Sequence, residues 1–567
     1  MALVIELGEQ MGFAPEIRQT DPGVQRSLRV YALDAMLRRS AGQIGSLSIP
    51  FEVLGGKFNS ARFKLGTKPG PFGSQPLSLV NLDDPALVAQ GGMKPDNANP
   101  QFAQQMVYAA ASWTLDRFRT ALGREPDYMS GRKLRLEPFG HSGKPSEYQP
   151  REHCVSFQWE DSSPHTRGAM QNDSLMLWAL SHDTIVHEVS HAFIFGVLRH
   201  CRFGLSKEVG YIGESYCDLI ALFAHFSHEA LVREAVEDRQ GLLDQRFSGY
   251  GWQAGLHENG KPPLRKSWLT WIRPFSEKPA ALDYGKAEGT QFQDILTCAV
   301  FEAFYTVYTQ KTERWQRLIK AQPGLRWDEA IIAAQVKEAQ QIAGQFLNIV
   351  IRSLDYLPPL DLNLGDVLRA MVTADMDMVP EDRWNYRESL IYAFRRYGVP
   401  VDGVGTLGEN ALRWSGDVNG VLNKNALLGL TRLPLVGAAA ISVATRTERG
   451  NIVEQFLNHN APNLAVLGLD GNADAQFPIR IETAHSVARV GPHGRLVINH
   501  VVQITQGKIT PAQYVMLGGC TLVVDGEGEL RFVIRKDLQR PDYEKTLEAF
   551  LDGEGSRYEP AYRKDNW

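Results

Sequence analysis

One stretch constrains this chain more than any other. Residues 181–226 read SHDTIVHEVSHAFIFGVLRHCRFGLSKEVGYIGESYCDLIALFAHF and contain His187, Glu188 and His191, the H-E-x-x-H pattern. Residues four apart lie on the same face of an α-helix, so the two imidazoles can bind one tetrahedral zinc ion. Glu188 lies about 100° round the helix from His187. It can therefore reach a water molecule at the metal, as the general base of a zinc hydrolase must.

The residues around this pattern predict a buried helix. Ser181 and Asp183 offer N-cap oxygens just before it. The flanking side chains are apolar nearly all round the helix: Ile185, Val186, Val189, Ala192, Phe193, Ile194, Val197 and Leu198. Two histidines and a carboxylate inside such a helix are costly without a partner. The alternative to a metal site is a pair of hydrogen-bonded core histidines.

A second apolar helix supplies a candidate for the third zinc ligand. Residues 213–218 read GESYCD and open a run of apolar residues that ends at Phe223. Glu214 and Asp218 are four apart and share one face. Glu214 can be the third ligand, and Asp218 can accept the spare N–H of a ligand histidine, which fixes the orientation of the ring. The alternative for Glu214 is a first-turn carboxylate that the helix dipole favours.

These motifs together resemble the thermolysin-like gluzincins, in which H-E-x-x-H is followed some twenty residues later by E-x-x-x-D. The resemblance implies that His187, His191 and Glu214 bind Zn2+, that Glu188 is the general base, and that Asp218 supports a ligand histidine. It extends over about residues 29–400 and is closest to bacterial members whose function is not characterised. It also implies an α+β fold with a β-rich N-terminal lobe, a helical C-terminal lobe and the active site between them.

Composition and charge exclude several other classes. The chain has 567 residues, a formal net charge of −5 and a sequence pI of about 6.3, without a Lys/Arg block. A nucleic-acid partner is therefore not expected. The first residues lack a secretory signal, and the apolar run 433–445 is too short to cross a membrane. Five scattered cysteines predict no disulfide framework, which favours the cytoplasm and departs from the secreted habit of thermolysin.

The order of elements before the zinc motif fits a substrate-binding sheet. Residues 100–122 predict a helix, because apolar side chains recur at helical spacing until Gly123. Residues 133–139 and 154–159 predict strands. Between them, residues 146–148 occupy the place where thermolysin-like enzymes present an edge strand to substrate. A peptide could add to such an edge by β-augmentation, although Tyr148 itself reads better as a packing residue.

The helix predicted at residues 290–309 lacks one family feature. In thermolysin-like enzymes a helix at this place begins with a histidine that stabilises the oxyanion, whereas residues 284–310 contain no histidine. The polar candidates at its start are Thr290, Gln291 and Asp294, and Tyr211 is a further candidate donor from the loop before Glu214. Loss of one such donor costs on the order of 10²–10³ in rate. Catalysis is therefore less firmly indicated than zinc binding.

The remaining pattern suggests four parts. We expect a β-rich N-terminal lobe with one long helix (1–180), a zinc-binding and helical lobe (181–400), a connecting segment (401–450) and a small β-rich C-terminal domain (451–567). Helices are predicted at 327–354, 364–374 and 388–397. An acidic turn at 375–382 is either solvated or a calcium site. The tail from Gly553 is polar and predicted to be loose.

The leading hypothesis is a cytoplasmic zinc metallopeptidase, most simply an endopeptidase, that acts on protein or peptide substrates. The zinc ion would polarise the water and the scissile carbonyl, and Glu188 would pass the proton of the water to the leaving amine. A second hypothesis is a zinc-holding, catalytically weak scaffold that binds or regulates partners through its C-terminal β domain. A third is a zinc hydrolase whose substrates are not peptides.

Overall fold

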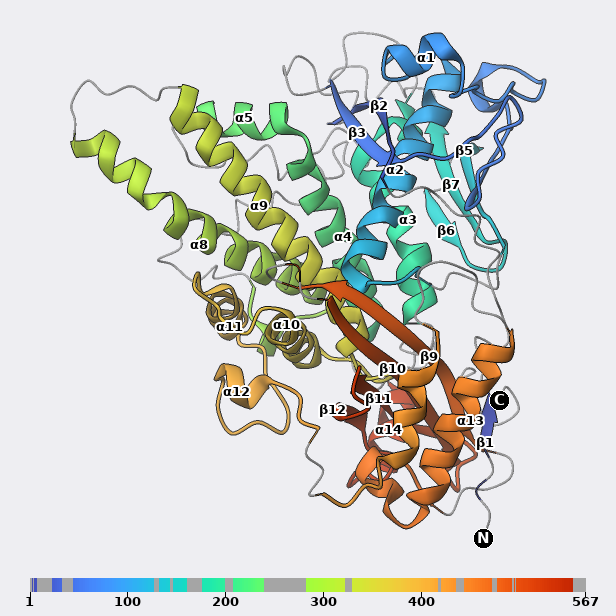
Figure 1. Cartoon of the computed structure of the whole chain (residues 1–567), viewed down its shortest axis with the longest axis vertical. Coiled ribbons are helices and arrows are strands. Elements are labelled where there is room, and N and C mark those ends of the chain that lie inside the picture. The colour runs from blue at the N-terminus through green and yellow to red at the C-terminus, as the bar shows by residue number, and fades with distance from the viewer. Residues whose placement is uncertain are drawn as a thin grey trace.

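The computed structural model describes residues 3, 5–7, 23–32, 44–126, 132–142, 146–160, 176–198, 208–238, 282–321, 329–416, 420–434, 443–471, 477–491, 494 and 496–553. Within these ranges the fold combines long helices with three separate β-sheets, as the predicted α+β class requires. Figure 1 shows the N-terminal sheets, the long helices and the C-terminal sheet as successive parts of the molecule. The predicted tail beyond Gly553 lies outside the described residues.

The N-terminal part contains two sheets that pack around one long helix. Strands β2 and β3 pair with each other, whereas β4, β5, β7 and β6 form the second sheet in that order, with β8 paired to β7. Because β6 pairs with β7 alone in that order, it is the edge strand that the sequence predicts near Tyr148. The elements are β2 (Gln25–Tyr31), β3 (Ile44–Pro50), β4 (Phe63–Leu65), α1 (Pro85–Ala89), α2 (Pro100–Leu122), β5 (Leu134–Ser142), β6 (Glu147–Gln149), β7 (Cys154–Glu160) and β8 (Met176–Leu177).

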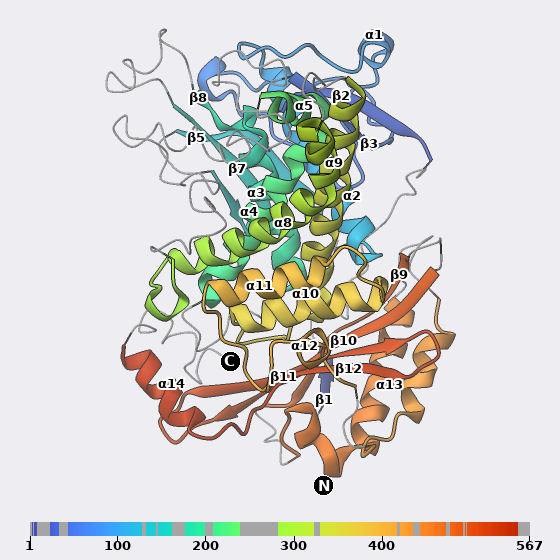
Figure 2. The same ribbon diagram turned by 90° about the vertical axis from the view of Figure 1, so that its left-hand side faces the viewer.

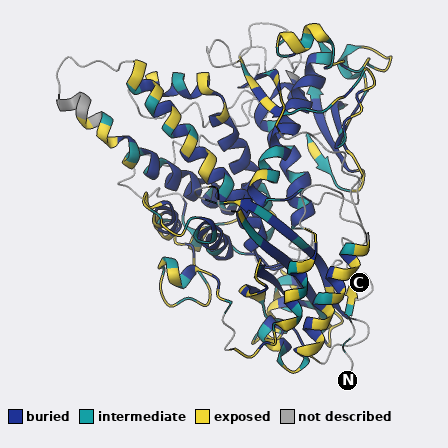
Figure 3. Cartoon of the chain, viewed as in Figure 1, coloured by how far each residue is buried: buried dark blue, intermediate teal, exposed yellow. Residues whose placement is uncertain are grey.

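Helix α2 matches its prediction at both ends. The Asn99 side chain accepts a hydrogen bond from Gln101 N at 2.9 Å, and Pro100 occupies the first turn, where its missing N–H costs nothing. Gly123 ends the helix with a φ of 69°, a conformation that favours glycine. Most of α2 is buried between the N-terminal sheets and the helices behind it (Figure 3), so the prediction of a core helix is confirmed.

The middle of the chain is helical. The helices predicted from periodicity are all present, and the largest difference is at the helix predicted for 290–309, which continues to residue 321. They are α3 (His182–Val197), α4 (Val209–Ala224), α5 (Glu229–Asp238), α8 (Gln291–Ala321), α9 (Glu329–Ser353), α10 (Leu364–Met378) and α11 (Tyr386–Arg396). Helix α4 packs against α3, α8 and α9, which places the helix of the E-x-x-x-D motif in the interior.

The acidic turn predicted at 375–382 is wrong in its first half, because α10 continues to Met378. Asp375 pairs with Arg387 at 2.7 Å between Oδ2 and Nη1. Asp382 accepts hydrogen bonds from the backbone N–H groups of Tyr386 and Arg387 and so caps α11. These carboxylates already have protein partners, which removes the argument for a calcium site in this segment.

The C-terminal part is built on a five-stranded sheet, in the order β1-β9-β10-β11-β12. Strands β9 to β12 are antiparallel neighbours, and a tight turn at residues 525–529 joins β11 to β12. Figure 2 shows α10 and α11 lying along this sheet. The strands are β1 (Ile5–Leu7), β9 (Ile479–Val490), β10 (Leu496–Ile509), β11 (Val515–Asp525) and β12 (Leu530–Lys536).

Three predicted boundaries in this part are wrong. Strand β1 pairs in parallel with β9, although the sequence placed residues 1–180 in the N-terminal lobe. Residues 401–450 do not merely connect, because Leu427 and Leu430 lie in the C-terminal core. Residues 451–459 are helical rather than extended. The helices here are α12 (Glu409–Leu412), η9 (Asn425–Arg432), α13 (Val443–His459), η10 (Ala461–Leu467) and α14 (Tyr543–Asp552).

A buried charge network joins the C-terminal sheet to the rest of the molecule. Arg489 on β9 forms an ion pair with Asp355, which also pairs with Arg124 at 2.8 Å, and all three side chains are buried. The Ala488 N–H donates to the carbonyl of Gly123, at the end of α2, at 3.0 Å. Removal of one partner from such a buried pair leaves an uncompensated charge. The sheet is therefore held against the end of α2.

The structure describes two features that the sequence analysis considered, membrane-spanning segments and cysteines. Within the described ranges, the longest and most apolar helices still fall short of what is needed to cross a bilayer. Cys154, Cys217, Cys298 and Cys520 are buried and form no disulfide with any described residue, whereas Cys201 lies outside the described residues.

Candidate metal centre

The helix pair α3 and α4 brings the two sequence motifs face to face. Ser181 is the N-cap of α3, and its Oγ accepts a hydrogen bond from Thr184 N. Helix α4 begins at Val209, five residues before Glu214. The alternative in which Glu214 is a first-turn carboxylate is therefore wrong, and its position in the second turn calls for another explanation.

Three side chains of this pair converge on one point. His187 Nε2 lies 3.1 Å from His191 Nε2 and 3.3 Å from Glu214 Oε2, and His191 Nε2 lies 3.4 Å from Glu214 Oε1. Three ligands that are each about 2.1 Å from a tetrahedral zinc ion lie about 3.4 Å from one another. The spacing and the nitrogen and oxygen chemistry of this donor set therefore both fit zinc.

The electrostatics of Glu214 also suit a ligand. Burial by itself would raise the pKa of this carboxyl, but hydrogen bonds from His187 and His191 outweigh it and hold the pKa well below its usual range. The carboxyl is therefore ionised at neutral pH, as a metal ligand must be. Its side chain is 38% exposed, whereas that of His187 is 3% exposed. The donors thus lie where the protein interior meets solvent.

Asp218 lies behind the ligand histidine, where the E-x-x-x-D spacing predicts it. Its Oδ1 is 3.0 Å from His187 Nδ1, and its side chain is fully buried. Its other oxygen accepts a hydrogen bond from the side-chain amide of Gln293 on α8. Asp218 can thus hold the His187 ring so that Nε2 faces Glu214 and His191. Gln293 was missed by sequence reasoning, because its partner lies 75 residues away.

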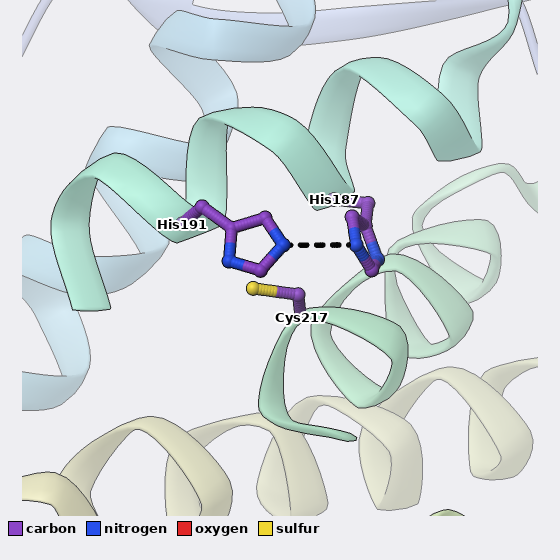
Figure 4. Close-up of side chains that lie close together, drawn as sticks. All are labelled: His187, His191 and Cys217. Carbon is purple, nitrogen blue, oxygen red and sulfur yellow. Dashed lines mark hydrogen bonds between the residues drawn. The ribbon is translucent and has the colours of Figure 1, made fainter. Parts of the chain in front are cut away.

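Cys217 is closer to the imidazoles than the sequence suggested. Its sulfur and one nitrogen each of His187 and His191 lie within 4.8 Å of one another (Figure 4). The sequence indicated no role for this cysteine, which is fully buried. Two donors on α4 therefore compete for the same pair of imidazoles. We favour Glu214, because its oxygens are 3.3 and 3.4 Å from the imidazole nitrogens and it borders the cavity.

Glu188 and the edge strand lie together at a cavity of about 520 Å³. The Tyr148 N–H of β6 donates to Glu188 Oε2 at 3.1 Å, so the strand orients the carboxylate. His187, His191 and Glu214 also line the cavity. Its apolar wall consists of Ile194, Phe195, Leu198, Val209, Ile212 and Leu362. The cavity thus combines the metal donors, a carboxylate beside them and an exposed strand edge.

The predicted oxyanion donors do not join this arrangement. Tyr211, Thr290 and Gln291 are all absent from the described residues that line the cavity. Gln291 Oε1 instead accepts a hydrogen bond from Glu288 N at 2.9 Å and caps the start of α8. Asp294, the other polar candidate at this helix start, lies in its first turn. Gln291 therefore caps α8 instead of lining the cavity.

No protein-family model matches the chain, and no curated protein matches it either. The chemistry of the helix pair is therefore inferred from its own residues and their spacing.

Proposed function

We propose that this protein is a zinc metallopeptidase of the thermolysin-like gluzincin type. The observation that carries the proposal is the set of three donor atoms on α3 and α4, which lie 3.1 to 3.4 Å apart with Glu188 beside them. His187, His191 and Glu214 would hold the zinc ion. The two lobes of that family would correspond to the N-terminal sheets and to helices α3–α11, and the cytoplasm remains the proposed location.

The residues of the chain divide the chemistry between them. A zinc ion held there lowers the pKa of water and polarises a carbonyl group. Glu188 accepts a proton from the attacking water and returns it to the leaving nitrogen. The hydrogen bond from Tyr148 N keeps the Glu188 carboxylate facing the cavity. Asp218 holds His187 in the orientation that the ligand needs.

The edge strand favours peptides over small molecules as substrates. Ser146, Glu147 and Tyr148 line the cavity along β6, so an extended chain could lie beside backbone rather than inside a closed pocket. Backbone pairing accepts many sequences, and the apolar wall adds a preference for apolar side chains. This supports an endopeptidase over a zinc hydrolase with a small non-peptide substrate.

A second candidate is a zinc-holding scaffold with weak catalysis. The observation that favours it is the absence of Tyr211, Thr290 and Gln291 from the described lining of the cavity. Without an oxyanion donor the rate would fall on the order of 10²–10³, while zinc binding would survive. In that case the C-terminal sheet would be the place where a partner docks.

Cleavage of a diverse peptide library, read by mass spectrometry, separates the two candidates. The chain is compared with Glu188→Gln after both are shown to carry equal zinc. Glu388→Gln, an exposed position on α11, is the matched control for the loss of one carboxylate. Cuts that disappear in Glu188→Gln and persist in Glu388→Gln support the peptidase. If zinc is bound and no peptide is cut, the scaffold becomes the better description.

A further inference from the structure

A second group of histidines lies at the other end of the same helix pair. His182 and Asp183 are in the first turn of α3, and His225 and His228 directly follow α4. Helices α3 and α4 run antiparallel, so the start of one meets the end of the other (Figure 1). All four residues are at most 4% exposed. We call them the sealed cluster, in contrast to the cavity site around His187.

The donor atoms of this cluster have the separation of metal ligands. One nitrogen or oxygen each from His182, Asp183 and His225 lies within 4.8 Å of the others. His225 Nε2 hydrogen-bonds to Asp183 Oδ1, and His182 Nδ1 is 4.0 Å from the same oxygen. Ligands of a tetrahedral zinc ion lie roughly 3.4 Å apart, so these atoms are close enough for one ion to replace the His225–Asp183 hydrogen bond.

One lone pair in the cluster lacks a partner. His182 Nδ1 is buried and makes no hydrogen bond to any residue that the structure describes, while His182 Nε2 lies 3.4 Å from His228 Nε2. If His182 carries its hydrogen on Nε2, it donates to His228 and leaves Nδ1 with a free lone pair. That lone pair lies on the side of Asp183 and His225. Metal-binding histidines commonly have this arrangement, with one nitrogen on the metal and the other in a hydrogen bond.

Burial disfavours the protonated form of His182 and of His228. Burial, together with the neighbouring histidines His228 and His225, lowers the pKa of His182 well below its ordinary value. Burial and His225 lower the pKa of His228 to about 3. A buried carboxylate beside neutral histidines is costly unless a cation or hydrogen bonds compensate it.

We propose that His182, Asp183 and His225 bind a second divalent transition-metal ion of the zinc class, with His228 holding His182 in place. The ion would tie the start of α3 to the end of α4. It would have a structural role, because the sealed cluster is buried. This inference does not depend on peptidase activity, since it concerns other residues and predicts a stoichiometry.

Metal counting on the full chain tests the proposal. The protein is equilibrated with Zn2+, freed of excess metal, and measured by native and inductively coupled plasma mass spectrometry. Two zinc ions per chain are expected, with one remaining in His187→Gln/His191→Gln. Addition of Asp183→Asn to that double variant should remove the remaining ion. A wild-type chain with a single zinc that disappears in the double variant would overturn the proposal, whether or not peptides are cut.

The double variant also allows a spectroscopic test, and its result does not depend on whether the triple variant folds. Loaded with Co2+, it should show visible absorption bands of a cobalt ion bound by nitrogen and oxygen ligands. Its thermal unfolding midpoint should fall when a chelator removes the ion. A folded double variant that binds no Co2+ and ignores the chelator would contradict a metal in the sealed cluster, and would leave hydrogen bonding as its role.

Discussion

Helices α3 and α4 carry two clusters of histidine and carboxylate side chains that differ in their surroundings. In the cavity site, Glu214 is 38% exposed at the side chain, and Glu188 stands beside the donors. In the sealed cluster, the same residue types are at most 4% exposed. The two are about five residues apart on α3, which is roughly 8 Å along a helix.

This difference in exposure suits the two clusters to different roles for a bound metal ion. A catalytic metal needs an open position for water or substrate, whereas a structural metal is enclosed by protein. The cavity site has the opening, the extra carboxylate and an edge strand at its rim. The sealed cluster has none of these among its described neighbours, but it joins the ends of two core helices. One cluster is therefore suited to reaction and the other to stability.

The most direct test of this division is to replace a carboxylate by an amide in each of the two clusters. Glu188→Gln should lower kcat/KM by on the order of 10²–10⁴, because it removes the proton acceptor. Its zinc content and unfolding midpoint should stay close to those of the original chain. Asp183→Asn should instead lower the free energy of unfolding by roughly 1.5–3 kcal/mol, because it weakens a buried charged hydrogen bond. Peptide cleavage assays and urea unfolding measure the two effects.

The division would be contradicted if the variant in the sealed cluster had the effect expected of the variant in the cavity site. If Asp183→Asn lowered kcat/KM as much as Glu188→Gln while the free energy of unfolding stayed constant, the sealed cluster would belong to the reaction.

The two clusters were not equally visible in the sequence. The four-residue spacing of His187 and His191, and that of Glu214 and Asp218, puts each pair on one helix face whatever the rest of the fold does. His225 and His228 follow the end of α4, and they meet His182 because the two helices pack antiparallel. A short connection between two apolar helices is the signal that could have placed them together. Periodicity alone does not encode that packing.

The elements of the fold also differ in how well they could be predicted from the sequence. Long periodic helices such as α2 and α9 could be predicted to within a few residues, because their own burial pattern defines them. Helix α13 was missed because Gly450 suggested a boundary, and a glycine inside a helix costs about 1 kcal/mol. The burial of Val453, Phe456 and Leu457 outweighs that cost. The partner of β1 could not be read from three residues, since any sheet edge can accept such a strand.

The second prediction tests how the cavity site is supported from behind. Asp218→Asn should weaken zinc binding by about 10–100-fold, because it removes the charge of the carboxylate that lies 3.0 Å from His187 Nδ1 and orients the ring. Competition with a chromogenic chelator gives the dissociation constant. Cys217→Ala on the same turn of α4 is the comparison. If Cys217→Ala weakened binding more than Asp218→Asn, the thiol and not Glu214 would be the third donor.

A third prediction probes the sealed cluster through a neighbouring strand. A Cβ on Gly45 of β3 would lie 2.5 Å from His228 Nδ1 and 3.3 Å from the Cβ of Ala32. Gly45→Ala should therefore displace His228 and lower the free energy of unfolding by about 1–2 kcal/mol. Gly56→Ala is the matched control, since no atom of the described ranges lies within 4 Å of its added carbon. Equal stabilities of the two variants in urea would show that the ring of His228 is free to move.

The smallest effect tests whether burial alone keeps an imidazole neutral in this protein, outside both clusters. Burial, with the charge of Arg449, lowers the pKa of His500 from 6.5 to about 4. Between these pH values the unfolded chain binds a proton that the folded chain does not, so stability is lost as the pH falls. The contribution should be about 1 kcal/mol between pH 7 and 5.5. His500→Gln should remove it from the pH dependence of urea unfolding, with the exposed His459→Gln as control. An unchanged slope in His500→Gln would contradict the expected shift, because it would mean that His500 binds its proton equally well in the folded and the unfolded chain.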